Sequence, residues 1–191
     1  MDADATQPLT AYGFLTAVEQ PGGGFYGGYL VLSPQGRPLE FRCTTPVRPS
    51  RAQEILYGAS LRPYLLGELL GGTLLADATL PVVAVLTDLP DMAQVATIRR
   101  EPVFVVAAEG VAACSPLAPT PQAASPNELP PISTKIERPG TTAEACVPAV
   151  LAPLAAHVAL AEPFERIRAA LREAHDVAQE TTELHGESRA A

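Results

Sequence analysis

Five arginines fall between residues 37 and 62, and they are Arg37, Arg42, Arg48, Arg51 and Arg62. Only two acidic residues lie among them in the sequence. Arg48 and Arg51 flank Ser50, where a helix is expected to begin, and the free N–H groups at a helix start attract anions. Arg42, Arg48 and Arg51 therefore form a candidate site for a phosphate, a carboxylate or the acidic tail of a partner. The alternative is a solvated charged face whose arginines pair with local acids.

A glycine-rich run, from Gly22 to Gly27, formally matches the pattern G-x-G-x-x-G. In dinucleotide-binding folds this pattern opens a helix whose N-terminus meets the pyrophosphate. Here the sequence YLVL follows, which predicts a strand instead. We therefore interpret the run as a flexible hairpin loop.

The cysteines and histidines have no spacing that is typical of metal ligands. Cys43, Cys114 and Cys146 are far apart and odd in number, which argues against a disulfide framework and favours a reducing compartment. The same lack of ligand spacing holds for His157, His175 and His185. We predict no metal site and no cofactor, and we interpret Cys43 as an inert core residue.

Hydrophobic periodicity predicts the elements that would position these side chains. Five strands are expected, over residues 11–19, 29–33, 39–44, 82–87 and 103–108. The first three should form an antiparallel meander, and the last two have the unbroken apolar runs of strands that are buried on both faces. Between the two groups, Ser50 and Gln53 form a capping box, and a second helix is expected from Pro63 to Gly71 and Gly72. The predicted fold class is α+β or α/β, with a mixed five-stranded sheet and flanking helices.

The third strand alternates cleanly between apolar and polar residues. Three of its residues are expected to face the core, namely Leu39, Phe41 and Cys43. The other three are expected to face solvent, namely Glu40, Arg42 and Thr44.

The order of three strands, a helix and a buried strand that ends in Thr-Asp resembles the first part of a ribonuclease H-like domain, over about residues 11–108. Glu54, in RAQE, stands where that family carries a helix glutamate, and Asp88, in VLTD, stands where it carries an aspartate after the fourth strand. The resemblance implies a carboxylate cage for two magnesium ions. The first strand lacks a central aspartate and has only Glu19 near its end, and no later acidic residue clearly completes the cage, with Glu109 the closest candidate. The resemblance therefore implies the scaffold without the activity. The favoured interpretation is that Glu54 is a surface helix residue and that Asp88 caps a turn.

A proline-rich segment separates the first part of the chain from the last. Eight prolines fall between Pro116 and Pro148. This composition is typical of a semi-extended linker, because it cannot bury enough apolar surface to fold. We predict a globular α/β-type domain over 1–112, a Pro/Ala-rich linker over 113–147 and a helical segment over 148–191.

The last segment carries an apolar stripe at helical spacing, formed by Phe164, Ile167, Leu171, Ala174 and Ala178. This stripe could fold back on the domain, or it could form an interface with another chain. A helix on a long tether suits partner capture, because the linker sets a high effective concentration.

Net charge narrows the classes of partner. The formal charge of −8 argues against general nucleic-acid binding and against docking on anionic lipid. The longest apolar stretch is interrupted by prolines and a histidine, so we expect no membrane span and a cytoplasmic location.

Three functions remain open from the sequence. The first is a non-enzymatic adaptor or assembly subunit that binds other proteins, which the missing catalytic motifs and the tethered helix favour. The second is a ribonuclease H-like nuclease that has lost some of its carboxylates. The third is a sensor that holds a small anion or a nucleotide at the arginine patch.

Overall fold

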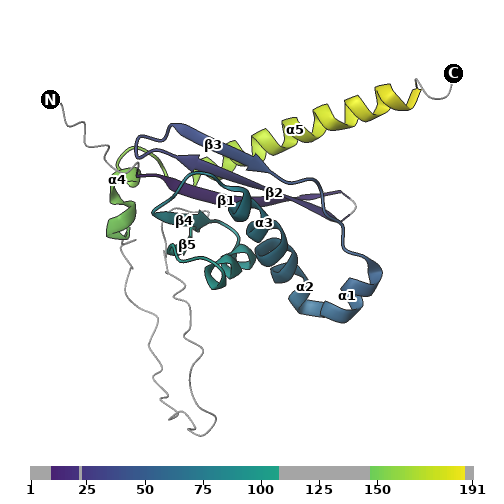
Figure 1. Ribbon diagram of the computed structural model, residues 1–191, viewed down its shortest axis with the longest axis horizontal. Helices are drawn as coiled ribbons and strands as arrows, with labels where there is room; N and C mark the ends of the chain where they lie inside the picture. Colours follow the sequence, from purple (N-terminus) through teal and green to yellow (C-terminus); the bar gives the residue numbers. More distant parts are fainter. Residues whose placement is uncertain (1–9, 22, 108–146, 188–191) are drawn as a thin grey trace, which may run out of the picture.

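The computed structural model describes residues 10–21, 23–107 and 147–187, with backbone alone for residues 176–187. Its centre is a five-stranded sheet of β1 (Tyr12–Gln20), β2 (Gly24–Leu32), β3 (Pro38–Cys43), β4 (Ala84–Thr87) and β5 (Val103–Val105). The strands lie in the order β3-β2-β1-β4-β5, antiparallel from β3 to β1 and parallel from β1 to β5 (Figure 1). The predicted mixed sheet, with its meander first, is confirmed.

Helices join and cover the strands. Between β3 and β4 lies one continuous helical stretch, which consists of α1 (Arg51–Tyr57), η1 (Gly58–Ser60), α2 (Leu61–Pro63), η2 (Tyr64–Gly71) and α3 (Gly72–Asp77). The 3₁₀-helix η3 (Pro90–Thr97) joins β4 to β5. The C-terminal part consists of η4 (Ala149–Leu151), α4 (Ala152–Ala155) and α5 (Glu162–Glu187). None of the helices in the described ranges is both long enough and apolar enough to cross a bilayer.

Local sequence explains where this helical stretch starts and why it continues. The predicted capping box is present, since Ser50 accepts a hydrogen bond from the Gln53 backbone and the Gln53 side chain accepts one from the Ser50 backbone. The sequence predicted that the helix ends at Gly71 and Gly72, but the helical stretch continues to Asp77. A Cβ at Gly71 would lie 2.6 Å from Val95, so this glycine lets η2 pack closely against η3.

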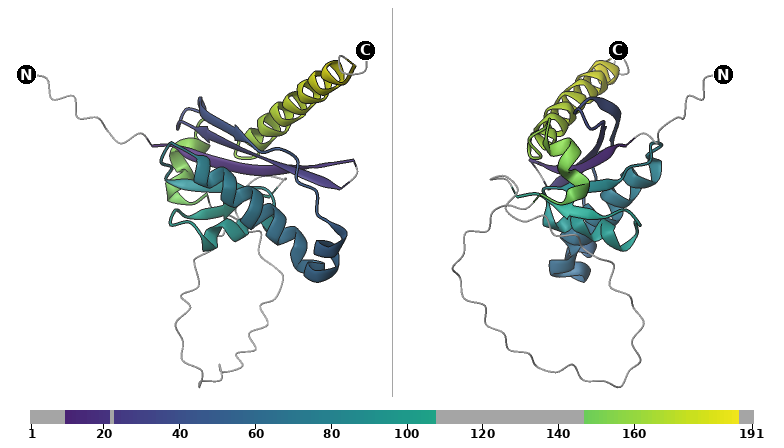
Figure 2. Two further views of the ribbon diagram at one scale, coloured as in Figure 1. Left: turned by 45° about the vertical axis from the view of Figure 1, so that its right-hand side comes forward. Right: turned by 90° about the vertical axis from the view of Figure 1, so that its left-hand side faces the viewer.

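Each face of the sheet carries its own apolar core. On one face, η2, α3 and η3 contribute Leu65, Leu66, Leu70, Leu74 and Met92. On the other face, the sheet residues Tyr12, Phe14, Leu30, Leu86 and Phe104 meet Leu151, Leu154, Phe164, Ile167 and Leu171 of the C-terminal part. Figure 2 shows α5 lying along this second face and continuing past the sheet. The C-terminal segment therefore supplies one wall of a core that it shares with residues 10–107.

The glycine-rich run is mostly strand, which corrects its interpretation as a loop. β2 begins at Gly24, and Gly23 makes the turn with a φ of 82°. A Cβ at Gly28 would lie 2.4 Å from Ile167, so the missing side chain makes room for α5 on the sheet.

The alternation of β3 was predicted correctly, but the apolar side is exposed rather than covered by a core. Leu39 and Phe41 are 38% and 39% exposed, and Cys43 is exposed. The Glu40 side chain is only 8% exposed, because it accepts hydrogen bonds from the backbone N–H groups of Thr79 and Leu80. β3 is an edge strand, and α5 does not extend over its apolar side, so the apolar residues stay in solvent.

Candidate functional site

Asp88 lies at the carboxyl end of β4, where it is bound by two side chains from other elements. Thr16 of β1 donates a hydrogen bond of 2.7 Å to Asp88 Oδ1, and Arg168 of α5 forms an ion pair with Asp88 Oδ2. The same guanidinium donates to Glu165 at 2.7 Å. The Asp88 carboxylate is therefore neutralised by a cation and oriented by a hydroxyl.

The sheet topology explains why these groups meet. β1 and β4 are parallel neighbours up to the pair Leu15 and Thr87, so the next residue on each strand, Thr16 and Asp88, lies at the same edge. Thr16 is fully buried, and the side chains of Asp88 and Arg168 are 12% and 23% exposed. Ligands of open α/β sheets bind at this carboxyl edge. Sequence reasoning found Asp88 but missed Arg168, because nothing in the local pattern shows that α5 reaches β4.

A pocket of about 540 Å³ opens beside this ion pair. Its apolar wall comes from the end of β5 and the start of α5, and it consists of Val106, Ala107, Ala159, Ala161 and Phe164. Its polar residues are Asp88, Glu162, Glu165 and Arg168. Since Arg168 already pairs with Asp88 and Glu165, the described residues that line the pocket offer no uncommitted cation for an anionic ligand.

The other carboxylates that the resemblance implied lie apart from Asp88. Glu54 pairs with Arg51 of the same helix at 2.8 Å, and Glu19 pairs with Arg62 at 3.1 Å. Glu109 lies outside the described residues. Within the described ranges, no three His, Cys, Asp or Glu side chains come together as a metal site. Glu54 and Asp88 are thus held in two separate ion pairs rather than in one cage.

The arginine patch is divided among local partners. Arg42 pairs with Glu40 at 2.8 Å, and Arg51 pairs with Glu54. Arg48 passes close to Gly24, with its Cγ 3.0 Å from where a Cβ would be. α1 has only seven residues, and its first turn is closed by the capping box. The arrangement is that of a charged surface with locally paired arginines, and it gives little support to an anion site.

The predicted interface stripe on α5 is largely internal. Phe164, Ile167 and Leu171 are at most 1% exposed, and Phe164 meets Phe14 edge-on with ring centroids 5.4 Å apart. Of the two alternatives for this stripe, these three residues take the first and fold back on their own sheet. Their burial against the sheet gives no support to the predicted interface with another chain. Ala174 is exposed, and the side chain of Ala178 lies outside the described residues.

A second group of apolar residues, on α1, is exposed. Ile55 and Leu56 of α1 are 68% and 81% exposed, and no residue of α1 is buried. Tyr57 stacks on Tyr64 with ring centroids 4.7 Å apart. Figure 1 shows α1 at the tip of the helical stretch, away from the sheet, and we call residues 51–60 the α1 arm. The hydrophobic pattern could not reveal this exposure. It indicates that a helix has an apolar face, but it does not indicate whether another element packs against that face.

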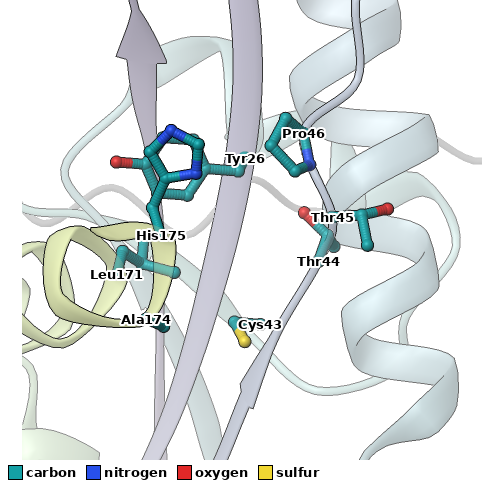
Figure 3. A pocket seen from close by; sticks show the side chains of 8 residues that line it. All are labelled: Tyr26, Cys43, Thr44, Thr45, Pro46, Leu171, Ala174 and His175. Carbon is teal, nitrogen blue, oxygen red and sulfur yellow. The ribbon is translucent and has the colours of Figure 1, made fainter. Parts of the chain in front are cut away.

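A smaller pocket, of about 220 Å³, lies between α5 and the end of β3 (Figure 3). Leu171, Ala174 and His175 of α5 form one side of it, and Cys43 forms part of the other. His175 is hydrogen-bonded to Gln20 and lies beside Tyr26, with ring centroids 5.6 Å apart. Cys43 is therefore a surface residue at a pocket mouth, which corrects its interpretation as a core residue.

Comparisons with known proteins add no relative to this description. The scan against family models, the search of curated proteins and the search of solved structures each found no match. Any proposal on function therefore rests on the chemistry and exposure of the side chains alone.

Proposed function

We propose that this chain is a non-enzymatic adaptor or assembly subunit, and that it binds a protein partner through the α1 arm. The observation that supports the proposal is the exposure of Ile55 and Leu56 on a helix with no buried residue. Burying each of these side chains would be worth about 1.5–3 kcal/mol, and the fold leaves this energy unused. Large apolar residues gathered on a projecting element are typical of interaction sites.

The spacing of the arm defines the kind of partner it fits. Ala52, Ile55 and Leu56 follow the positions i, i+3 and i+4 of α1, and all three are exposed. This is the anchor spacing of a helix that docks in an apolar groove. A seven-residue helix is only marginally stable by itself. The capping box and the Arg51–Glu54 pair keep the arm helical before binding, which lowers the entropy lost on docking.

The state of the carboxylates supports a role without catalysis. A two-metal site needs several carboxylates around one cleft. Here the Arg168 guanidinium occupies the ion-pairing position on Asp88, and Glu54 lies on the exposed arm. The nuclease alternative therefore has less support than the adaptor, and the sensor alternative is weakened by the local pairing of Arg42 and Arg51.

The test compares two tagged double variants of the full chain with wild type, in the cells that naturally make it. In the first, Ile55→Ser and Leu56→Ser remove the arm's anchors. In the matched control, Val83→Ser and Ile98→Ser remove two apolar residues that are 38% and 56% exposed elsewhere. We expect one protein to be recovered stoichiometrically with wild type and with the control, and to fall at least tenfold with the arm variant. Binding measured with that protein in purified form should likewise be equal for wild type and the control, and at least tenfold weaker for the arm variant.

Two outcomes would contradict the proposal. One is a set of recovered proteins that is the same for all three chains. The other is Mg²⁺-dependent cleavage of a nucleic acid by the purified chain that disappears in Asp88→Asn, which would make the nuclease alternative the better one.

A further inference from the structure

The outer side of β3 offers backbone groups for pairing. Within the described residues β3 pairs with β2 alone. The Thr44 N–H donates to Gly27 O at 3.0 Å. This bond determines which residues of the strand direct their backbone N–H and C=O groups toward β2. Because the two directions alternate in an antiparallel pair, the N–H and C=O groups of Phe41 and Cys43 point away from the sheet. An edge of this kind is a template for another strand.

The same strand exposes apolar side chains beside that edge. Phe41 lies opposite Leu30 of β2, whose side chain belongs to the core under α5, so Phe41 is on the α5 face. Phe41 and Leu39 are nevertheless 39% and 38% exposed, since α5 packs on β1 and β2 and leaves β3 uncovered. The pocket lined by Cys43 adjoins this surface (Figure 3).

The order of residues along β3 is complementary to itself. In an antiparallel pair centred on Phe41, Glu40 of one copy stands opposite Arg42 of the other, and Leu39 stands opposite Cys43. Opposite charges and apolar residues thus match on both sides of the centre. A centre on Glu40 or on Arg42 would instead place two like charges together. Self-complementarity of this kind is the property of a twofold interface between identical subunits.

We propose that β3 is the surface through which two copies of this chain associate, as an antiparallel strand pair centred on Phe41. Leu39 of each copy then faces Cys43 of the other, at the mouth of the pocket beside His175. This surface is separate from the α1 arm, so the association goes beyond the proposed function and leaves the arm free for a different protein.

The strand pair is short, which sets its strength. Stable interfaces bury about 1,200 Å² or more, and a pair of six-residue strands buries less. The dissociation constant is therefore expected on the order of 10–100 µM. Pro38 and the register shift between Val31 and Leu32 restrict pairing at one end of β3, which favours a closed dimer over an open chain of copies.

The first experiment is sedimentation velocity on the reduced full-length chain from about 1 to about 300 µM. Wild type should shift from monomer to dimer across this range. Phe41→Glu places two carboxylates at the twofold centre and should weaken association at least tenfold. The matched control is Ile98→Glu, at a residue that is 56% exposed and distant in sequence, and it should behave like wild type. A wild-type monomer at every concentration, or an unchanged Phe41→Glu dimer, would overturn the proposal.

The second experiment tests the register by cross-linking, and it does not depend on the Phe41 variant. In a Cys114→Ser, Cys146→Ser background, Leu39→Cys places a thiol opposite the Cys43 of the second copy. Within one chain these positions are about 13 Å apart along the strand, beyond the about 7 Å limit for a disulfide. Oxidation should therefore give covalent dimers, and adding Cys43→Ser should abolish them.

The control for cross-linking is Val83→Cys in the same background, at a residue with the same 38% exposure as Leu39. Leu39→Cys should form dimers at least tenfold faster. Equal cross-linking rates for the two variants would overturn the register. Protection of the β3 amides from hydrogen exchange that appears only when a different protein is added would overturn it as well. Either result would leave partner binding by the α1 arm untouched, because that test uses other residues.

Discussion

Helices α1 and α5 both carry apolar stripes, and they differ in what lies opposite. The stripe of α5 meets Phe14, Leu30 and the other sheet residues of the second core, and its members are at most 1% exposed up to Leu171. The apolar residues of α1 pack against no core in the part of the chain that the structure describes. The comparison teaches that an apolar pattern indicates a surface that would be stabilised by burial. The topology determines whether the chain itself buries that surface or leaves it available to another protein.

The largest expected effect comes from truncating one residue in each stripe. Phe164→Ala removes a ring from the second core and should lower the free energy of unfolding by about 3–5 kcal/mol. Leu56→Ala removes an exposed side chain and should change it by less than about 0.5 kcal/mol. Urea denaturation of the two variants measures both values. Similar losses in the two variants would remove the distinction between the helices.

The ion pairs of the two helices give a second, smaller contrast. Arg168 ties α5 to Asp88 in a partly buried pair, so Arg168→Met should cost about 2 kcal/mol by leaving that carboxylate without its cation. Arg51 pairs with Glu54 on the surface of α1, and Arg51→Met should cost about 0.3 kcal/mol. Thermal unfolding of both variants is the measurement. A larger loss for Arg51→Met than for Arg168→Met would contradict this picture of α5.

The edge strand adds a prediction on pH. Burial alone would raise the pKa of Glu40, but hydrogen bonds from the Thr79 and Leu80 backbone and from Arg42 outweigh it and hold the pKa at about 2, below the ordinary 4.5. Unfolding therefore takes up a proton between these values, and the free energy of unfolding falls as the pH drops through this window. Glu40→Gln should cost about 1.5 kcal/mol at neutral pH and should flatten that fall. The same dependence of the free energy of unfolding on acidic pH in wild type and in Glu40→Gln would contradict the role of Glu40.

The smallest expected effect lies in the first core. Tyr29 is fully buried, and its hydroxyl has no hydrogen-bond partner among the described residues. Burial raises the pKa of Tyr29, so the phenol stays neutral. Tyr29→Phe removes the unsatisfied hydroxyl and should raise the free energy of unfolding by about 1 kcal/mol. A loss of stability in chemical denaturation would show that the hydroxyl is satisfied in solution.

The sequence predicted the sheet better than the surroundings of the sheet. Its strands were found because alternation and continuous apolar runs are local, and the capping box at Ser50 was found because it needs only four residues. The exposure of Phe41 and Cys43 could not be predicted, because alternation does not say how far a helix covers the apolar face. Arg168 was missed for a related reason, since its pairing with Asp88 joins residues that are 80 positions apart.

Amide hydrogen exchange on the isolated full-length chain tests most directly the claim that α5 belongs to the core and that α1 is free for a partner. We predict that amides of residues 166–171 exchange at least 100-fold more slowly than those of residues 54–57, because the former open only with the second core. Equal protection of the two segments, or faster exchange in 166–171, would contradict it.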